Sequence, residues 1–269
     1  MSSATKTLEL LNCFSAARPE IGLSQLCRLA TQDKATTYRR LQSLEETGFV
    51  EQNPLTKRYR LGPALLQLAQ TREATVPRKA GAAEPLRQLA DCSGETAHVS
   101  VLSGTTLYKL LAVESPHHSI RVIIDIQSFP LHATASGLCA LAFGPDKLFD
   151  VATEVLTSFT PNTIVSADAL RASIEVTRAS GFGWADGSFE AEALSLAAPV
   201  FDQSGLFAGA VSVASVATRF TNDLERIIKA QLIEASRQIT RNWGGTVPTS
   251  VEQAWADVPV PHRDGESTR

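Results

Sequence analysis

The stretch from residue 33 to residue 62, DKATTYRRLQSLEETGFVEQNPLTKRYRLG, constrains the fold most, because it predicts a helix followed directly by a hairpin. Gly48 stands where a helix ends, and the short strands "FVEQN" and "KRYRLG" flank the polar tip "PLT". Two short helices are expected before it, "TKTLELLNCF" with Thr5 as N-cap and "LSQLCRLA" with Ser24 as N-cap. Three helices and a hairpin in this order predict a winged helix-turn-helix domain.

The third helix of this domain has an apolar and a polar face. Tyr38, Leu41 and Leu44 are expected to pack on the first two helices. Arginines on the opposite face suit the base edges of the major groove, and a basic hairpin suits backbone phosphates. The candidate DNA-binding residues are Lys34, Thr36, Thr37, Arg39, Arg40, Ser43, Lys57, Arg58 and Arg60. A helix with a solvated basic face, or a winged helix that binds protein, would show the same pattern.

Charge is distributed unevenly along the chain. Residues 1–79 hold 12 Lys and Arg against 7 Asp and Glu, whereas the remainder holds 13 against 21. Opposite signs in two segments indicate two domains with different partners, and the basic one suits a polyanion.

Several classes of protein are disfavoured by the sequence. It has no apolar run of about 20 residues and no signal peptide, so we expect no membrane contact. The four cysteines are far apart and show no CxxC pairing, which favours a reducing cytoplasm and no metal or cofactor. Common catalytic motifs are missing, and we expect no enzyme; Cys139 near His132 is more typical of a buried structural cysteine.

The rest of the chain predicts an antiparallel sheet flanked by helices. "GPALLQLAQTREA" predicts a helix for a linker, a dimer seam or the domain's own core, and Pro85 is expected to interrupt the next helix. "TAHVSVLSGTTLYKLLAV" and "LSLAAPVFDQSGLFAGAVSVAS" predict hairpins, and "SIRVIIDI" predicts a separate strand. Two helices are expected in "ADALRASIEVTRASG", ended by Gly181, and in "NDLERIIKAQLIEASRQITRNW". From residue 246 onward the composition predicts a loose tail.

Residues 5–242 resemble the isocitrate lyase regulator (IclR) family of bacterial transcription factors. The resemblance rests on "KATTYRRLQSLEETGFVE", "RYRLGP", "FPLHATASGLCALAF" and "GFGWADGSFEAEALSLAAPVFDQSGLFAGAVSVASVATRFT". It implies an α+β chain with a winged helix-turn-helix domain (1–62), a linker helix (63–77), a GAF-like effector-binding domain (78–245) and a tail (246–269). It also implies a homodimer or homotetramer, a double-stranded DNA operator and a small organic or aromatic acid as effector. A dimer would read an inverted repeat.

A pocket for that acid is expected where "FPLHATASGLCALAF" turns into a helix near Thr134, because small residues and free amides there suit a carboxylate. An ordinary capped helix on a sheet would look the same. The residues that the family resemblance and the aromatic content together suggest for effector binding are Phe129, Ala135, Ser136, Gly137, Trp184, Asp186, Ser195, Ser212 and Ala214. Further candidates are Tyr108 and Phe189 for an aromatic wall, and His132 and Arg121 as carboxylate partners.

The chain departs from the family pattern at Gln127, Leu138, Ala185, Glu192 and Ser195. These departures put two- and three-carbon keto acids in doubt as effectors. The alternative function is a winged-helix and GAF-like scaffold that binds a protein partner or senses redox state.

Overall fold

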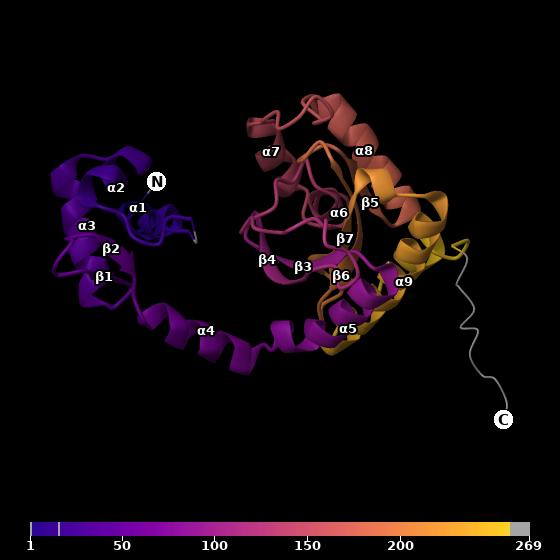
Figure 1. The fold of residues 1–269 in the computed structure, drawn as a ribbon, viewed down its shortest axis with the longest axis horizontal. Coiled ribbons are helices and arrows are strands. Elements are labelled where there is room, and N and C mark those ends of the chain that lie inside the picture. The colour runs from indigo at the N-terminus through magenta and orange to yellow at the C-terminus, as the bar shows by residue number, and fades with distance from the viewer. Residues whose placement is uncertain (1, 16, 259–269) are drawn as a thin grey trace. The chain divides into compact units, whose positions relative to one another are not determined.

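The structure is a computed structural model of the 269-residue chain and describes residues 2–15 and 17–258. The chain divides into two compact units, Met1–Pro77 and Arg78–Arg269 (Figure 1). Each unit has its own buried apolar cluster, as two independent domains require.

The first unit is a winged helix-turn-helix followed by one long helix. Its elements are α1 (Ser3–Leu8), the 3₁₀ helix η1 (Glu9–Cys13), α2 (Leu23–Leu29), α3 (Lys34–Glu46), β1 (Val50–Gln52), β2 (Tyr59–Leu61) and α4 (Ala64–Thr75). The expected helices and hairpin are confirmed, and Gly48 follows α3 with a left-handed φ of 73°. The expected N-caps were wrong. Ser2 caps α1, where its hydroxyl accepts from the amide of Thr5 at 3.1 Å, and Gly22 precedes α2.

The core of this unit forms where the helices meet the hairpin. Leu41 and Leu44 of α3 are buried with Leu10 and Leu26, as expected. Tyr38 was expected to join them but is 45% exposed, and Thr37 takes the buried position one residue earlier. Because α-helical positions recur every 3.6 residues, the row formed by residues 37, 41 and 44 faces inward and residue 38 faces outward.

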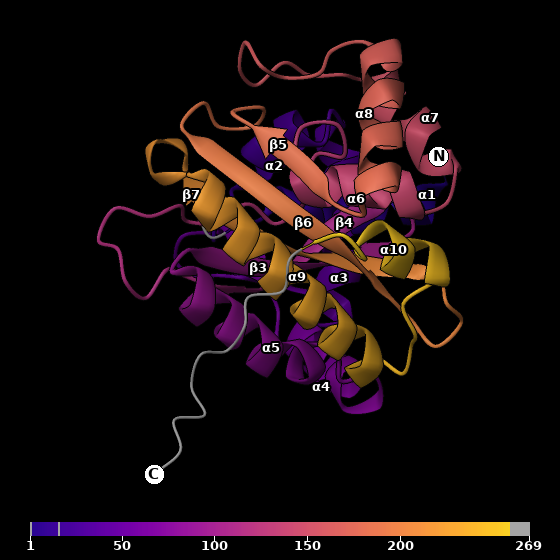
Figure 2. The same ribbon diagram turned by 90° about the vertical axis from the view of Figure 1, so that its right-hand side faces the viewer.

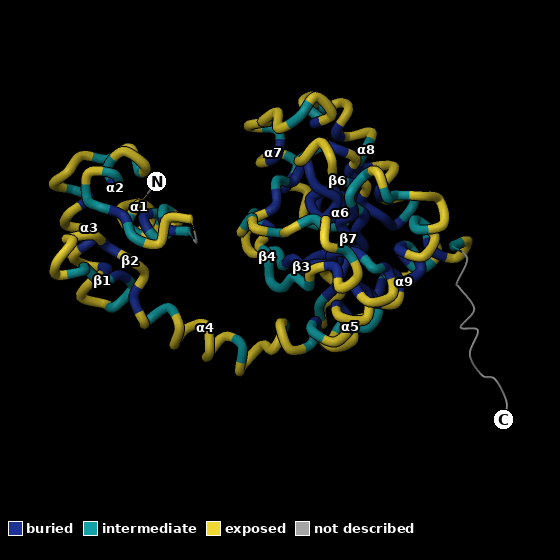
Figure 3. The backbone as a smooth tube through the Cα atoms, in the orientation of Figure 1, coloured by how far each residue is buried: buried dark blue, intermediate teal, exposed yellow. Residues whose placement is uncertain are grey.

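Helix α4 is exposed over most of its length (Figure 3). It contains no buried residue, and Leu66 and Leu68 are 69% and 54% exposed. Within the described chain, these leucines therefore do not belong to a core.

The second unit is a five-stranded antiparallel sheet with helices on both faces. Its elements are α5 (Arg78–Ser93), β3 (Thr96–Ser103), β4 (Thr106–Val113), α6 (Ala135–Phe143), α7 (Lys147–Glu154), α8 (Ala167–Ser180), β5 (Gly183–Asp186), β6 (Ala193–Phe201), β7 (Phe207–Val216), the 3₁₀ helix η2 (Ala217–Arg219), α9 (Asn222–Asn242) and α10 (Thr249–Ala254). The strand order is β4-β3-β7-β6-β5. The α+β class, both hairpins and the helix that ends at Gly181 are confirmed.

Helices pack on the two central strands from both sides (Figure 2). Helix α6 contacts β5, β6 and β7, while α5 and α9 pack on each other and against the sheet. Strands β6 and β7 are consequently buried along most of their length. Such double coverage explains why their sequences are almost continuously apolar or small.

Three expectations for this unit were wrong. Residues 119–126 form no strand; Pro85 lies buried inside a continuous α5; and the chain beyond residue 245 continues into α10. Trp255 after α10 is 2% exposed, and its Nε1 donates to the carbonyl oxygen of Gly181 at 3.1 Å. The expected tail thus packs on the domain at least to Trp255, and its last residues, 259–269, lie outside the described chain.

Candidate functional site

The outward face of α3 carries most of the candidate DNA-binding side chains. Lys34, Arg39 and Ser43 are exposed, and Thr36 and Arg40 are half-buried. Arg40 donates through Nη1 to the side-chain oxygen of Gln32, so its guanidinium is already held. Thr37 does not belong to this face, because it is fully buried and its hydroxyl donates to the carbonyl oxygen of Asp33 at 2.8 Å.

Two further residues, which were not among the candidates from the sequence, complete this face. Tyr38 and Gln42 are exposed, and the amide nitrogen of Gln42 lies 3.4 Å from the hydroxyl of Tyr38. The α3 face therefore consists of Lys34, Thr36, Tyr38, Arg39, Arg40, Gln42 and Ser43.

The tip of the β1–β2 hairpin presents Lys57 and Arg58 to solvent. The side chain of Asn53 shapes the turn by accepting from the amides of Leu55 and Thr56. Arg60 is also exposed but pairs with Glu51 at 2.5 Å and with Glu20 at 3.8 Å. Its charge is thus partly compensated, whereas that of Lys57 has no ion pair in the described chain.

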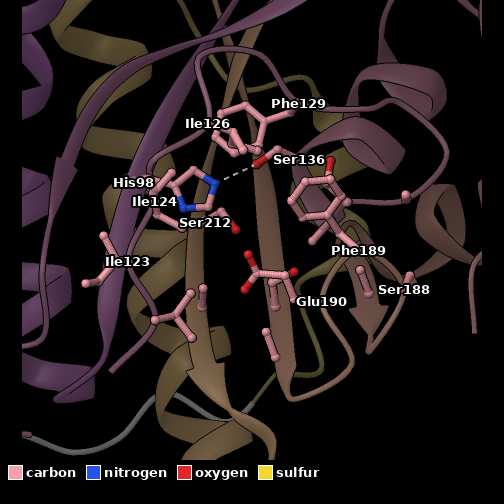
Figure 4. Close-up of a pocket in the computed structure, with 18 of the residues that line it drawn as sticks. His98, Ile123, Ile124, Ile126, Phe129, Ser136, Ser188, Phe189, Glu190 and Ser212 are labelled. Carbon is pink, nitrogen blue, oxygen red and sulfur yellow. Dashed lines mark hydrogen bonds between the residues drawn. The ribbon is translucent and has the colours of Figure 1, made fainter. Parts of the chain in front are cut away.

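A pocket lies in the second unit between the start of α6, the inner strands and two loops (Figure 4). The cavity has a volume of about 60 Å³ and opens to solvent on one side. The lining residues are His98, Val122, Ile123, Ile124, Asp125, Ile126, Phe129, Ala133, Thr134, Ala135, Ser136, Ala185, Ser188, Phe189, Glu190, Ala193, Ser195, Ser212 and Ala214. Apolar walls with a few hydroxyl and carboxylate groups are typical of a small-molecule site.

His98 projects from β3 into the wall of this pocket. The ring is 4% exposed, stacks on Phe129 with centroids 4.7 Å apart, and places Nε2 3.2 Å from Oγ of Ser136. Its Nδ1 is buried and has no hydrogen-bond partner in the described structure. Burial, helped by the charge of Lys109, lowers the pKa of His98 to about 3, so the imidazole is neutral at physiological pH.

The first turn of α6 supplies backbone donors to the pocket. Thr134 is the N-cap, and its hydroxyl accepts from the amide of Gly137 at 3.0 Å. Ala135 and Ser136, which precede that bond, line the pocket, and their amides have no acceptor among the described groups. Unpaired amides at a helix start attract anions.

Six candidate effector residues come together here as expected: Phe129, Ala135, Ser136, Ser195, Ser212 and Ala214. Ser195 and Ser212 do project from one face of the β6–β7 hairpin, because Ser212 pairs with Ala197 and Ser195 with Ala214. The hydroxyl of Ser212 donates to the carbonyl oxygen of Leu196 at 2.7 Å, so Ser195 is the less committed of the two.

Three other candidates lie outside the pocket lining. In β5, Trp184 and Asp186 are exposed, while Ala185 between them faces the pocket. This alternation is the ordinary two-residue period of a strand. Gly137 packs against the backbone just before α6, since a Cβ there would lie 2.5 Å from the carbonyl oxygen of Leu131.

The remaining candidates for the pocket are engaged elsewhere. His132 places Nε2 2.9 Å from the carbonyl oxygen of Thr157, and Arg121 pairs with Glu114. Tyr108 is 43% exposed and does not line the pocket. Cys139 contacts the carbonyl oxygen of Ala197 instead of His132, and burial raises the pKa of its thiol to about 12. Such a thiol is unreactive.

Sequence reasoning missed His98, Asp125, Glu190 and the apolar segment 122–126. His98 had one usable signal, its place in the alternation of "TAHVSV", which puts it opposite Ser212 across β3 and β7. No group of three or more possible metal ligands gathers in the part of the chain that the structure describes. Likewise, none of the described helices is long and apolar enough to cross a bilayer.

Two family models match the chain. The IclR helix-turn-helix domain matches residues 3–54, and the C-terminal domain of the bacterial transcriptional regulator IclR matches residues 76–241. The glycerol operon regulatory protein of Streptomyces griseus is 32% identical over 83% of this chain and 88% of its own length. The regulator XynR of Escherichia coli is 24% identical over 91% and 98%.

Solved structures show the same architecture. An IclR transcriptional regulator from Silicibacter sp. TM1040 superposes with a TM-score of 0.87 and is 39% identical, covering 93% of this chain and 99% of that one. An IclR homologue from Microbacterium hydrocarbonoxydans, solved with 4-hydroxybenzoate, gives a TM-score of 0.72 at 22% identity over 90% and 99% of the two chains. At that identity, the second likeness shows the fold alone.

Because both family models describe a bacterial transcriptional regulator and one of them its helix-turn-helix domain, the chain is a DNA-binding transcriptional regulator. The matches cover both units, and the chain belongs to the IclR family.

Proposed function

We infer that the protein is a sequence-specific regulator whose DNA binding is modulated by a small organic acid bound in the pocket of the second unit. The observation that supports this proposal is the start of α6, where Ala135 and Ser136 line the pocket and their amides have no acceptor within the described chain. A carboxylate there would gain two oriented donors and the helix dipole. The hydroxyl of Ser195 offers a further hydrogen bond.

The apolar walls indicate a body larger than a two-carbon acid. Phe129 and Phe189 line the pocket together with the isoleucines of segment 122–126, and Phe189 lies on the side away from Ile123 and Ile124 (Figure 4). The 4-hydroxybenzoate of the Microbacterium hydrocarbonoxydans homologue is one acid of this size, and it supports including aromatic acids in the class. As a regulator of bacterial DNA, the protein would act in the cytoplasm.

We expect the working form to be a homodimer or homotetramer on an inverted repeat. One winged helix reads few base pairs, and two copies double the readout with half-sites about one helical turn, or a multiple of it, apart. The exposed leucines of α4, Leu66 and Leu68, are available for contact between copies. Light scattering that shows a monomer at micromolar concentration would contradict this part.

The test is a thermal-shift screen of small aliphatic and aromatic carboxylates, followed by operator binding with and without each hit. Ser195→Leu fills the pocket from a half-buried position and should abolish the shift. Ser103→Leu is the matched control, since Ser103 is exposed at the end of β3 and does not line the pocket. A bound acid should change operator affinity by about 5–150-fold, the usual range of coupling between sites.

The outcomes separate this proposal from its alternative. An acid that stabilises wild type and Ser195→Leu equally binds elsewhere. If no acid changes stability or operator affinity, a scaffold for a protein partner becomes the better interpretation. The inert Cys139 thiol gives no support to redox sensing.

A further inference from the structure

The charged side chains that line the pocket are acidic. Asp125 and Glu190 both belong to the lining, and no lysine or arginine does so among the described residues. Neither carboxylate has a salt bridge or a side-chain hydrogen bond in the described structure. Glu190 turns its carboxylate toward the centre of the pocket (Figure 4). A ligand with only negative charge would be repelled by both groups.

The nearby basic side chains do not offset this acidity. Lys109 does not line the pocket; its Nζ donates to the carbonyl oxygen of Ile124 at 2.7 Å, and its charge reaches the neighbouring His98. Arg121 pairs with Glu114. His98 adds no positive charge, since burial keeps its ring neutral. Among the lining groups, the start of α6 is therefore the electropositive feature, and Glu190 is a negative charge without an ion pair that faces the same space.

The buried ring of His98 provides a second, independent sign of a ligand. Its Nδ1 lacks a partner although the residue lines the pocket, and a buried polar atom without a hydrogen bond is costly. Depending on which ring nitrogen carries the proton, Nδ1 offers either a donor or an acceptor. A ligand with both donor and acceptor groups satisfies either tautomer.

The polar groups lie at two separate places. Ser136 and His98 stand together at the end of the pocket near Phe129, and Glu190 lies apart from them beside Ser188 and Phe189 (Figure 4). An apolar body between these places would contact Phe129, Phe189 and the isoleucines of segment 122–126.

We propose that the effector is an amino-substituted acid, with a carboxylate at the start of α6 and a protonated amine, separated from it by an apolar body, at Glu190. This rests on the proposed function, because it names the ligand class of the same pocket. The amine neutralises Glu190 and converts a repulsive site into a charge-assisted hydrogen bond. Asp125 strengthens the preference for a ligand without net negative charge.

Calorimetric titration of the full-length protein with three matched probes tests the proposal: 4-methylbenzoate, 4-(hydroxymethyl)benzoate and 4-(aminomethyl)benzoate. We expect the amine to bind about 10–100-fold more tightly than the other two, the range for a hydrogen bond between charged groups. Straight-chain pairs, pentanoate with 5-aminopentanoate and hexanoate with 6-aminohexanoate, repeat the comparison for a flexible body.

Glu190→Gln removes the charge at nearly constant shape and should abolish the preference for the amine while leaving 4-methylbenzoate at least as tightly bound. Glu192→Gln is the matched control, since Glu192 is an exposed neighbour outside the lining. Both residues are on the surface, so both variants should fold.

Each result decides the matter. Plain acids that bind as tightly as their amino counterparts, with no effect of Glu190→Gln, overturn this inference and leave the proposed function standing. Equal binding of the hydroxymethyl and aminomethyl probes overturns the need for a positive charge. If none of the acids, plain or substituted, binds the wild type, both this inference and the proposed function fail.

Discussion

Nε2 of His98 lies 3.2 Å from Oγ of Ser136 and connects strand β3 to the first turn of α6 across 38 residues of sequence. This is the one hydrogen bond of the buried imidazole within the described structure, since Nδ1 has no partner. The pair holds the ring against Phe129 and fixes the polar end of the pocket.

Replacing Ser136 by alanine should therefore destabilise the second unit. Both ring nitrogens of His98 would be left without a protein partner, and a buried unsatisfied group costs about 1–3 kcal/mol. Urea denaturation of Ser136→Ala measures this loss. Ser195→Ala is the control, because the Ser195 hydroxyl has no partner in the described chain and its removal should change stability by about 0.5 kcal/mol or less. Equal effects of the two substitutions would contradict the role of Ser136.

The buried His98 also predicts a pH dependence of stability. In the folded protein its pKa is lowered to about 3, whereas an unfolded chain takes up the proton near its ordinary value of 6.5. The unfolded state thus binds more protons between these values, and stability should fall as pH decreases below about 6.5. The contribution of His98 to the slope is at most about 1.4 kcal/mol per pH unit.

His98→Gln removes that contribution while keeping a polar side chain. We expect the free energy of unfolding of the variant to depend less steeply on pH than that of the wild type between about pH 5 and pH 7. Denaturation curves at several pH values provide the comparison, in which contributions from the other histidines cancel. If the free energy of unfolding depends on pH equally steeply in the variant and the wild type, His98 is not a buried, neutral group in the folded protein.

Arg39 is the arginine of the α3 face that is free to reach a base edge, because Arg40 is held by Gln32. Arg39→Ala should weaken binding to the cognate operator by about 1–3 kcal/mol and relax the sequence preference at one position. Fluorescence anisotropy with cognate and scrambled duplexes measures both effects. Arg60→Ala is the control, since the Arg60 charge is already paired with Glu51 and Glu20. If Arg60→Ala weakens operator binding more than Arg39→Ala does, Arg60 and not Arg39 makes the stronger DNA contact.

Lys57 at the hairpin tip should contact phosphate without reading sequence. Its φ of 58° is left-handed, so Lys57→Asn removes the charge with a residue that tolerates this backbone. We expect weaker binding to all duplexes alike, and the slope of log affinity against log salt should fall by about one unit. A loss confined to the cognate operator, or an unchanged salt slope, would exclude a phosphate contact.

Trp255 should be a structural residue of the second unit. It is buried beside Phe182 and donates to the carbonyl oxygen of Gly181, which a side chain at position 181 would obstruct. Trp255→Ala should lower the free energy of unfolding by about 3–5 kcal/mol, the usual cost of deleting a large buried ring. Chemical denaturation measures the loss, and Trp243→Ala provides a comparison with a half-buried ring. An unchanged midpoint for Trp255→Ala would show that the tail is dispensable.

Elements with a strong local signal were predictable from sequence. The α3 helix, its Gly48 stop and the β6–β7 hairpin follow from periodicity and turn residues, which depend on neighbours along the chain. "SIRVIIDI" carries an equally strong strand signal but forms no strand. A strand also needs a continuous partner, and the chain pairs with β4 only at an isolated bridge between Ser128 and Tyr108, after this segment has ended.

The pocket was partly predictable for a similar reason. The serines of the hairpin and the small residues of α6 follow from register and helix start, both local properties. Whether His98 and Glu190 line the pocket depends on which distant segments of the chain come together. The spacing of residues in the sequence does not predict this. The sequence assigned three residues to the wrong face of their helix or strand: Tyr38, Trp184 and Asp186. A shift of one residue along a strand moves a side chain to the opposite face.

The apolar wall of the pocket comes from segment 122–126, which is not part of the sheet ladder. Its attachment runs through backbone carbonyls, with Val122 accepting from the hydroxyl of Thr96 and Ile124 from Lys109. Because neither bond involves a side chain of the segment, its residues can be exchanged without shifting strand register. If the pocket binds the proposed acid, new ligand preferences can therefore evolve along this wall by single substitutions, while the domain that binds DNA is inherited unchanged.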